Sequence, residues 1–385
     1  MTGLKKCGLS IVILAAATAG LLGQDPPPAK PAPAKAAAAD TPRIDKEAGT
    51  FKDGKRGDVP EGAAEMVTPA VERSVRTGLD WLVKQQAPDG SFGSGTYRGN
   101  LAVTSLAGLA FMANGSSPGR GPYGAPIERA LSFIMENVQP GGFIAVRGES
   151  THGPMYSHGF ATLFLAECYG MTRRADIREK VEKAVRLIVD CQNPEGGWRY
   201  QPQPRDADTS VTICQINALR AARNAGIFVP KETVEKCIKY VRECQNPDGG
   251  FRYMTQGGAS QFPRSAAGVV ALQSAGIYDS KEIDLGIKYL KQFMPNGPGA
   301  NQNAGGGNGG QRSSHYFYGQ YYAAQAMWLR GGDDWNQWYP SVRDELISKQ
   351  TTQGYWSDHV CNEYGTAMAA IVLQVPNNFL PIFQR

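Results

Sequence analysis

The feature that most constrains the fold of this chain is an internal repeat of about 53 residues, found six times after Thr68. Each copy has an amphipathic helix, a Gln, a glycine turn, an aromatic residue, a loop and a second helix of small and apolar residues. The clearest copies carry the Gln at Gln86, Gln192, Gln245 and Gln350. The two weaker copies carry Val138 and Met294 there, and the six positions are 52, 54, 53, 49 and 56 residues apart. The pattern predicts one repeat architecture, although 385 residues alone would suggest two or three domains.

The two helices of each repeat differ in how their apolar residues are distributed. In the fourth repeat the first helix has an apolar stripe at i, i+3, i+4 and i+7, formed by Val234, Cys237, Ile238 and Val241. The second helices are apolar or small nearly all round, at residues 101–113, 160–168, 211–225, 266–275, 316–329 and 366–375. Such helices must be buried on both sides. The sequence therefore predicts two layers, with amphipathic helices outside and apolar helices inside.

Six helical hairpins can stack into an open solenoid or close into a ring. An open solenoid needs polar capping repeats at its ends. Here the first and last repeats are among the best matches and carry no special polar face. We therefore expect an all-α fold that closes into a six-hairpin α/α toroid.

The repeat, best seen as Gln192-x-x-x-Gly196-x-Trp198, is similar to the Gln-Trp repeat of squalene–hopene cyclases. It is also similar to the repeat of protein prenyltransferase β-subunits, and the resemblance covers about residues 69–375. The resemblance implies their shared α/α toroid but not one activity, because such toroids include cyclases, transferases and non-enzymatic proteins. We interpret the recurring Gln and aromatic residues as structural, with the amide bound to a helix end and the ring packed against the neighbouring repeat.

In a toroid of this kind, the loops after the outer helices lead to the N-termini of the inner helices. These ends have N–H groups without intrahelical partners and a partial positive charge, and they meet at one mouth of the ring. All four histidines fall in these loops or first helical turns, namely His152, His158, His315 and His359. We predict a ligand site at this mouth, formed by His158, Arg264, His315, Tyr318 and Glu363. The alternative is that polar residues simply gather in loops.

The short segment from Pro204 to Ser210 contains two further candidates, Asp206 and Asp208. It resembles the Asp-x-Asp-Asp-Thr segment with which squalene–hopene-type cyclases protonate an alkene, and this resemblance implies catalytic roles for both. Protonation of an alkene needs a carboxylic acid that stays protonated and is made unusually acidic by its neighbours. In one alignment Asp208 is the donor, and in the other Ala207 stands at the donor position, so one carboxylate is missing in either case. The alternative role of Asp208 is a helix N-cap.

Metal binding is the other chemistry that the resemblance raises. Protein prenyltransferases bind zinc with an Asp, a Cys two residues later and a distant His. Here Ser210 stands two residues after Asp208, and Cys214 lies nearly two helical turns further on. Because zinc needs three or four well-placed ligands, we expect no metal and no other cofactor. Cys191 and Cys244 share one repeat position, which favours buried packing thiols, with one disulfide as the alternative.

The N-terminus has the pattern of a secretion signal. Lys5 and Lys6 precede an apolar run at residues 8–23, which is shorter than the roughly 20 residues that cross a membrane. We predict a signal peptide at 1–24, a disordered Pro/Ala/Lys-rich linker at 25–66 and the toroid at 67–385. The protein would then be exported, as a periplasmic, secreted or envelope-associated protein without an integral membrane span. An uncleaved anchor is the alternative.

The charge of the chain bears on its partners. A formal charge of +5, with no block of five or more Lys and Arg residues, argues against nucleic acid. We predict an exported toroid whose central pocket takes an isoprenoid-like or other apolar small molecule and acts on it by acid catalysis. The alternative is a non-catalytic, envelope-associated scaffold that binds an unknown protein. A carbohydrate-active toroid would need two carboxylates across a groove, for which Asp208 and Glu363 are the candidates.

Overall fold

The computed structural model describes residues 59–60, 62–146, 153–295 and 315–384. The predicted signal peptide, most of the predicted linker and His152 lie outside the described residues. Within these ranges the chain is helical, and its only β-structure consists of isolated bridges. None of the helices in this part of the chain combines the length and the apolar character that crossing a membrane requires.

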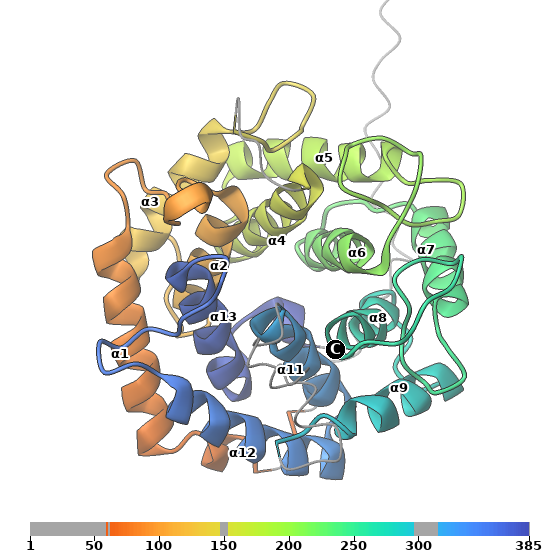
Figure 1. The fold of residues 1–385 in the computed structure, drawn as a ribbon. Helices are drawn as coiled ribbons and strands as arrows, with labels where there is room; N and C mark the ends of the chain where they lie inside the picture. Colours follow the sequence, from red (N-terminus) through yellow and green to blue (C-terminus); the bar gives the residue numbers. More distant parts are fainter. Residues whose placement is uncertain (1–58, 61, 147–152, 296–314, 385) are drawn as a thin grey trace, which may run out of the picture. The chain divides into compact units, whose positions relative to one another are not determined.

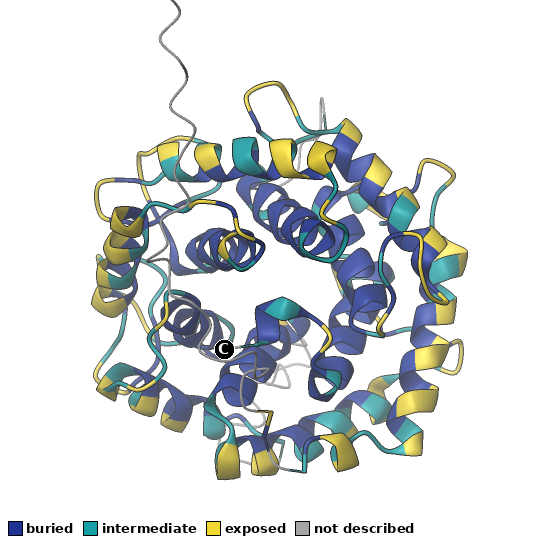
Figure 2. Cartoon of the chain, turned by 180° about the vertical axis from the view of Figure 1, so that it is seen from behind, coloured by how far each residue is buried: buried dark blue, intermediate teal, exposed yellow. Residues whose placement is uncertain are grey.

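In the described ranges, α-helices form two concentric layers around one axis (Figure 1). The outer helices are α1 (Pro69–Gln85), α3 (Gly124–Glu136), α5 (Ala175–Asp190), α7 (Lys231–Glu243), α9 (Lys281–Lys291) and α12 (Gly332–Lys349). The inner helices are α2 (Leu101–Met112), α4 (Pro154–Thr172), α6 (Thr209–Asn224), α8 (Phe262–Ser274), α11 (Tyr316–Arg330) and α13 (Asn362–Gln374). Figure 2 shows that the inner helices are buried nearly all round, whereas the outer helices expose one face. The predicted two layers are confirmed.

The ring closes where the last repeat meets the first. Gln350, at the end of α12, donates its Nε2 to the carbonyl of Ser74 in α1 at 2.9 Å, and its Oε1 accepts from the Ser74 hydroxyl at 2.7 Å. Gly354 has a φ of +96°, and a Cβ there would come within 2.6 Å of the Thr77 side chain in α1. Helix α13 packs against α1 and α2. The predicted six-hairpin toroid is therefore confirmed.

The repeat residues hold each outer helix to the next one. The amide of Gln192 donates to the carbonyl of Gly196 in its own turn and to that of Thr233 in α7, both at 2.9 Å. The same pair of bonds recurs at Gln86, Gln245 and Gln350. A Cβ on Gly196, whose φ is +101°, would come within 2.1 Å of the carbonyl oxygen of Lys236. The Gln of each repeat is thus structural, as predicted, and the glycine permits the close approach of two backbones.

A second recurring contact joins each turn to the inner layer. In four repeats the backbone N–H of the aromatic residue donates to a hydroxyl near the start of the following inner helix, at 2.8 to 3.1 Å. The accepting residues are Thr104, Thr212, Ser265 and Thr366. We call this place in the repeat the acceptor position.

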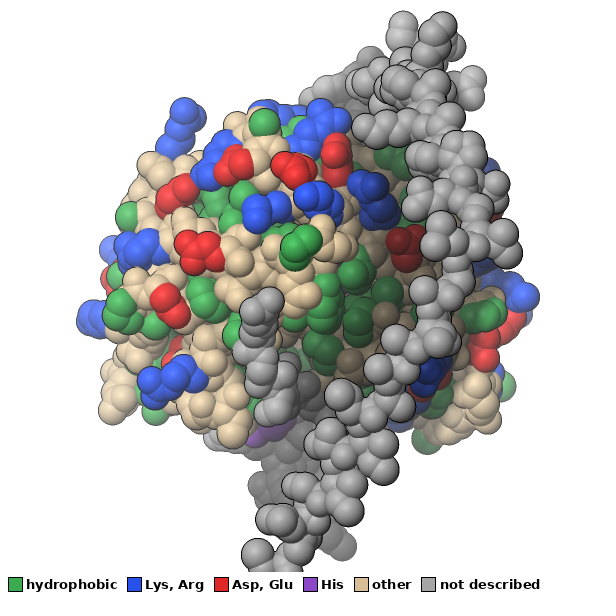
Figure 3. Space-filling model, turned by 90° about the horizontal axis from the view of Figure 1, so that it is seen from above, with side chains coloured by type: hydrophobic (Ala, Val, Ile, Leu, Met, Phe, Trp, Pro, Cys, Tyr) green, Lys and Arg blue, Asp and Glu red, His purple; other side chains and the backbone are tan. Residues whose placement is uncertain are grey.

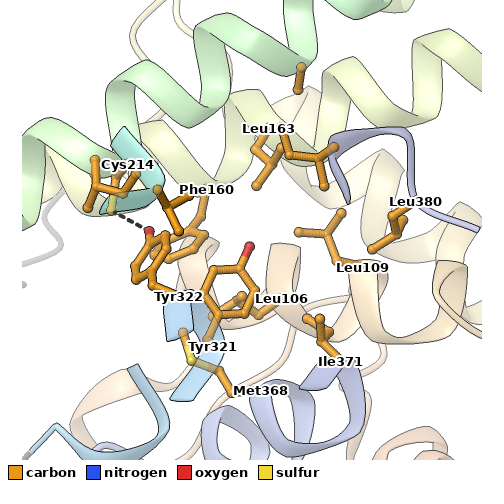
Figure 4. Close-up of a cluster of buried hydrophobic side chains, with 14 of the residues drawn as sticks. Leu106, Leu109, Phe160, Leu163, Cys214, Tyr321, Tyr322, Met368, Ile371 and Leu380 are labelled. Atoms are coloured by element: carbon orange, nitrogen blue, oxygen red, sulfur yellow. Dashed lines mark hydrogen bonds between the residues drawn. The ribbon is translucent and has the colours of Figure 1, made fainter. Parts of the chain in front are cut away.

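The axis of the toroid is filled with apolar and aromatic side chains. Figure 4 shows part of this cluster, including Leu106, Leu109, Phe160, Leu163, Tyr321, Met368, Ile371 and Leu380. Leu380 lies between two short 3-10 helices, η3 (Val375–Asn377) and η4 (Pro381–Phe383). The carbonyl of Phe383 accepts from Nε1 of Trp328 in α11 at 3.0 Å. Among the described residues the cysteines are free and buried, as predicted.

The described surface carries both signs of charge. Figure 3, a view onto the outer side of the toroid, shows Lys and Arg side chains interspersed with Asp and Glu on that face. The ion pairs on the outer helices include i,i+4 pairs such as Lys183 with Glu179 in α5 and Lys236 with Glu232 in α7. Such exposed pairs contribute little to stability individually, and they give this face no strong net field.

Candidate functional site

A cavity of about 490 Å³ lies at the end of the toroid where the inner helices begin. The first turns of all six inner helices and the loops before them contribute to its lining, and we call it the mouth cavity. Apolar lining residues include Ala102, Val103, Phe160, Pro263 and Val360. Hydrogen-bonding side chains come from Tyr97, Tyr156, Tyr200, Tyr253, Tyr318, Tyr364, Asn100, Ser157, Ser210, Gln261, Arg264, His315 and His359. This combination suits a molecule with an apolar body and a polar group.

Tyrosines are the largest group of lining side chains. The hydroxyls of Tyr200 and Tyr253 lie 2.5 Å apart, and the two residues are 53 positions apart, in consecutive repeats. The predicted Tyr318 also lines the cavity and donates to the carbonyl of Ser210 at 2.9 Å. Burial raises the pKa of Tyr156 and of Tyr318 well above the usual value, so both hydroxyls stay protonated at neutral pH. Tyr200 and Tyr253 were not predicted, although each follows the repeat aromatic by two residues.

Arg264 and His315, two of the predicted ligand-binding residues, both line the mouth cavity. Arg264 lies in the first turn of α8 and donates Nη2 to the carbonyl of Ala259 at 3.0 Å. Its buried Nε has no hydrogen-bond partner in the described structure, and only tyrosines, not carboxylates, act favourably on its charge. Desolvation and the charge of His359 lower the pKa of His315, Asp358 opposes them, and Arg264 adds the smallest lowering effect. Because a partly buried cation in a cavity is normally paired, this arrangement leaves a place for an anion.

His359 lies beside His315 in the cavity, with the two ring centroids 5.9 Å apart. Its Nδ1 is 3.0 Å from Oδ1 of Asp358, whose side chain is only 6% exposed. The same carboxylate oxygen accepts from the backbone N–H of Val360 at 2.8 Å. Asp358 thereby orients the imidazole and leaves Nε2 available for other contacts. Neither His359 nor Asp358 was among the predicted site residues.

Asp208, the predicted proton donor, is the N-cap of α6. Its Oδ1 accepts from the backbone N–H of Val211 at 2.9 Å. The carboxyl is completely buried and does not line the mouth cavity. Its Oδ2 has no hydrogen-bond partner within the described ranges and lies 3.9 Å from Nε of Arg199. Burial raises the pKa of Asp208 to about 6, opposed by the N–H of Val211 and by Arg199.

The other two predicted carboxylates also lie away from the cavity. Asp206 is half exposed and forms an ion pair with Nη1 of Arg199. Glu363, in the first turn of α13, is buried and accepts from the hydroxyl of Ser94 at 2.9 Å. The lining contributed by the described residues thus contains no carboxylate. Asp208 and Glu363 do not form the pair across a groove that a glycoside hydrolase would need.

His158, the remaining predicted ligand-binding residue, performs the role that Thr or Ser has at the acceptor position. Its Nδ1 accepts from the backbone N–H of Ile144 at 3.2 Å, so its Nε2 carries the hydrogen and donates to the carbonyl of Ala184 at 3.3 Å. The ring is fully buried and does not line the cavity. Burial lowers the pKa of His158 to about 4. The structure therefore separates His158 from Arg264 and His315 and gives it a structural role.

The ends of the inner helices differ from the expectation that they offer free N–H groups. Asn100 accepts from a first-turn N–H of α2 at 3.0 Å. The carbonyls of Tyr200 and Tyr253 accept from the N–H groups of Met155 in α4 and Thr209 in α6, at 3.0 and 2.9 Å. In each of these three helices, at least one first-turn N–H group is therefore already engaged by the protein itself. The lining side chains add further polar groups to the mouth cavity.

The zinc chemistry of the protein prenyltransferases does not fit this site. In the part of the chain that the structure describes, no group of three or more His, Cys, Asp or Glu is placed to hold a metal ion. Ser210 lines the cavity where a cysteine would be needed, and Cys214 is buried with its sulfur 3.4 Å from the Tyr322 hydroxyl. We derive no step through a metal.

Comparison with known families decides the classification. The prenyltransferase alpha-alpha toroid domain matches residues 63–292 and, in a second overlapping match, residues 169–355. The chain belongs to the prenyltransferase α/α-toroid family. The two matches begin 106 residues apart, which corresponds to two repeat lengths. The predicted resemblance is therefore confirmed.

Two curated relatives are both named drimenyl diphosphate synthase. The protein from Streptantibioticus cattleyicolor is 33% identical over 85 residues, which are 22% of this chain and 15% of the relative. The protein from Streptomyces showdoensis is 24% identical over 172 residues, which are 45% of this chain and 31% of the relative. The matched regions thus span less than a third of each relative.

Solved structures share the fold across several chemistries. The type II terpene cyclase MstE from Scytonema has a TM-score of 0.54 at 16% identity and covers 81% of this chain and 100% of its own. A cellobiose 2-epimerase from Bacillus thermoamylovorans has a TM-score of 0.59 at 11% identity, with coverages of 80% and 99%. An alpha-1,6-mannanase from Salegentibacter has a TM-score of 0.58 at 10% identity, with coverages of 79% and 98%. At these identities the likeness concerns the fold, and function must be argued from the site.

Proposed function

We propose that the mouth cavity binds a small molecule with an apolar, isoprenoid-like body and an anionic head group. The observation that carries this proposal is the state of Arg264, which lines the cavity without a carboxylate partner in the described structure. Partly burying a cation without a carboxylate partner costs free energy, and a bound anion would offset that cost. His315 and His359 add ring nitrogens on the same side of the cavity.

The rest of the cavity supports an apolar body for the ligand. Phe160 and Val103 line it, as do the rings of tyrosines whose hydroxyls are partly engaged within the protein. The curated relatives are named for the synthesis of a terpenoid diphosphate, and MstE has been solved in complex with geranylgeranyl dihydroxybenzoate as substrate. Both names agree with an isoprenoid carrying a polar end.

The binding proposal can be tested by isothermal titration calorimetry with farnesyl phosphate, farnesol and inorganic phosphate. We expect saturable binding of farnesyl phosphate and weaker binding of the two partial ligands. Arg264→Gln should weaken farnesyl phosphate by about 10- to 100-fold, which corresponds to the loss of one charge-assisted hydrogen bond. The same substitution should leave farnesol nearly unchanged. Arg223→Gln, at an exposed position near the opposite end of α6, removes the same charge and serves as the control.

Two results would contradict the binding proposal. One is the absence of saturable farnesyl phosphate binding to the wild type. The other is an equal effect of Arg264→Gln and Arg223→Gln, which would mean that only the net charge of the protein matters.

A second candidate function is acid catalysis on the bound ligand by Asp208. It is supported by the unpartnered Oδ2 and by the pKa of about 6, which keeps a proton on the carboxyl in mildly acidic solution. Asp208 lies near the cavity, because its charge raises the pKa of Tyr253 and of Tyr156, which both line it. This function requires the carboxyl to reach the cavity from its buried place. It predicts that Asp208→Asn abolishes product formation from farnesyl phosphate while binding persists, and unchanged turnover would exclude it.

We also propose that the protein binds its ligand outside the cytoplasm. This proposal rests on the pattern of residues 1–24, in which two lysines precede a short apolar run. N-terminal sequencing of the protein from a secreting host is the test. We expect a mature chain that begins near residue 25, whereas an intact N-terminus would favour the retained anchor.

A further inference from the structure

The pair formed by Asp358 and His359 places an imidazole beside a nearly buried carboxylate at the mouth cavity. We propose that His359, oriented by Asp358, is a general base that removes a proton from the carbon next to a carbonyl group held by Arg264. This inference rests on the proposed function, because it assigns a chemistry to the same cavity. It names the substrate class as isoprenoid-like molecules whose polar end contains a ketone or aldehyde carbonyl.

The geometry of the pair supports this role. A neutral imidazole that donates its Nδ1–H to a carboxylate presents Nε2 as a proton acceptor. Here Nδ1 lies 3.0 Å from the Asp358 carboxylate, which is nearly fully buried, while the His359 side chain is 53% exposed and lines the cavity. When Nε2 takes up a proton, the adjacent carboxylate stabilises the resulting imidazolium.

The residues that face His359 fit the other half of the reaction. His315 packs edge to face against its ring, and both Arg264 and His359 lie close enough to His315 to lower the pKa of that residue. Arg264 lines the same cavity as the two histidines. Its unpartnered N–H can stabilise negative charge that develops on a carbonyl oxygen. A base and a cationic donor around one opening are the parts that proton removal next to a carbonyl requires.

A purely structural role would not need this combination. The turn at this point is closed by the bond from the Val360 N–H to Asp358, which an asparagine could accept equally well. His359 is half exposed and contributes little to the core. By contrast, His158 is fully buried with both ring nitrogens engaged by backbone groups. The two histidines thus differ in the feature that matters for catalysis, an available nitrogen.

The proposed step is balanced without a co-reactant. The C–H bond next to the carbonyl breaks, and its proton forms an N–H bond with Nε2 of His359. The electron pair of the C–H bond moves into the carbonyl, giving an enolate whose oxygen faces Arg264. Return of a proton from the imidazolium to carbon reverses the step, so in heavy water the net result is exchange of hydrogen for deuterium.

The test uses farnesylacetone, a neutral isoprenoid ketone, incubated with the full chain in heavy water and analysed by mass spectrometry. We expect the wild type to accelerate deuterium uptake next to the carbonyl. His359→Gln should reduce the rate at least 100-fold, in line with the contribution of a general base, and Asp358→Asn at least 10-fold. Asp190→Asn, an exposed change of the same type on α5, should have no effect. Arg264→Gln should also slow exchange.

A second measurement follows the positioning role of Asp358 without any substrate. In ¹⁵N NMR spectra of the wild type we expect the neutral His359 ring to carry its hydrogen on Nδ1. Asp358→Asn preserves the turn but weakens this preference, so the Nε2–H tautomer should increase. Circular dichroism should show Asp358→Asn folded, so that a change of tautomer is not a consequence of unfolding.

The outcomes separate this inference from the proposed function. If farnesyl phosphate binds but the wild type does not exchange farnesylacetone, the base assignment is overturned and the binding proposal stands. Equal exchange by His359→Gln and the wild type would overturn it too, as would a wild-type ring that carries its hydrogen on Nε2. If farnesyl phosphate itself does not bind, the binding proposal fails first.

Discussion

The contact that closes the ring gives a quantitative prediction about stability. Gln350 donates to the carbonyls of Ser74 and Gly354 and accepts from the Ser74 hydroxyl, at 2.9, 2.8 and 2.7 Å. Each such bond contributes about 0.5 to 1.5 kcal/mol, so Gln350→Ala should lower the free energy of unfolding by about 2 to 4 kcal/mol. Gln192→Ala, which removes two bonds of the same kind within the ring, should cost about 1 to 3 kcal/mol.

A double-mutant cycle isolates the part of this energy that depends on closure. Ser74→Ala removes the hydroxyl that Gln350 accepts from, so the coupling free energy between the two substitutions should be about 1 kcal/mol. Urea unfolding followed by circular dichroism measures all three variants and the wild type. A coupling free energy near zero, with Gln350→Ala costing less than Gln192→Ala, would mean that the first and last repeats do not meet in solution.

Three further predictions concern side chains whose roles the structure distinguishes. Burial lowers the pKa of His158 to about 4, so the stability that the neutral ring contributes is complete above pH 6.5 and is lost as the pH falls to 4. In urea unfolding, His158→Thr should therefore reduce the acid-induced loss of unfolding free energy by up to about 3 kcal/mol. The pH dependence that Asp208 causes has the opposite sign, because its pKa is raised to about 6 and the protein therefore loses stability as the pH rises from 3.8 to 6. Asp208→Asn should remove up to about 3 kcal/mol of that loss, while Asp208→Ala should cost about 1 kcal/mol more than Asn because it also removes the helix cap. Arg264 lies three positions after the N-cap of α8, where α2 and α6 have Val103 and Val211. Arg264→Val should therefore raise the thermal midpoint of unfolding, while binding of farnesyl phosphate is lost. A pH profile that is unchanged in either of the first two variants, or a lower thermal midpoint in the third, would contradict the assigned roles.

The fold could be predicted because its defining contacts are made by repeated residues between neighbouring repeats. The amide of Gln192 reaches Thr233 in the next outer helix, and Gly196 allows the two backbones to approach. Both residues recur at the repeat period, so one copy describes the others. Closure was also predicted from the sequence, since the first and last repeats lack the polar faces of capping repeats. The structure confirms it, because Gln350 bonds the carbonyl of Ser74 in α1 as Gln192 bonds that of Thr233 in α7.

The site was harder to predict, because the sequence gives the depth of a residue along its helix but not the direction of its side chain. His158 lies in the weak second copy, where Ile144 replaces the repeat aromatic, so its equivalence to Thr104 and Thr212 is not visible from the repeat. Its place one turn into α4 directs the ring toward the outer layer. His315, at the start of α11, has no such acceptor role and lines the cavity.

Loop residues posed a different difficulty. Tyr200 and Tyr253 approach each other across two repeats, and their contact depends on loop conformations that periodicity does not specify. The orienting role of Asp358 likewise depends on a turn closed by the N–H of Val360. The sequence predicts that polar groups gather at this end of the ring. It does not show which of them bond to other parts of the protein and which face the cavity.

A residue that departs from the repeat is often taken as a sign of function, yet the two clearest departures here lead to opposite conclusions. His158 replaces a hydroxyl residue, and both of its ring nitrogens are engaged by backbone groups, so the departure is absorbed by the fold. Arg264 replaces an apolar residue such as Val211 and keeps a buried N–H without a partner in the described structure. The fold gives that charge only a backbone carbonyl and the face of Tyr253, and no carboxylate among the described residues, so part of its desolvation cost is not offset. In a repeat protein it is therefore the unsatisfied departure, and not departure as such, that indicates where a ligand binds.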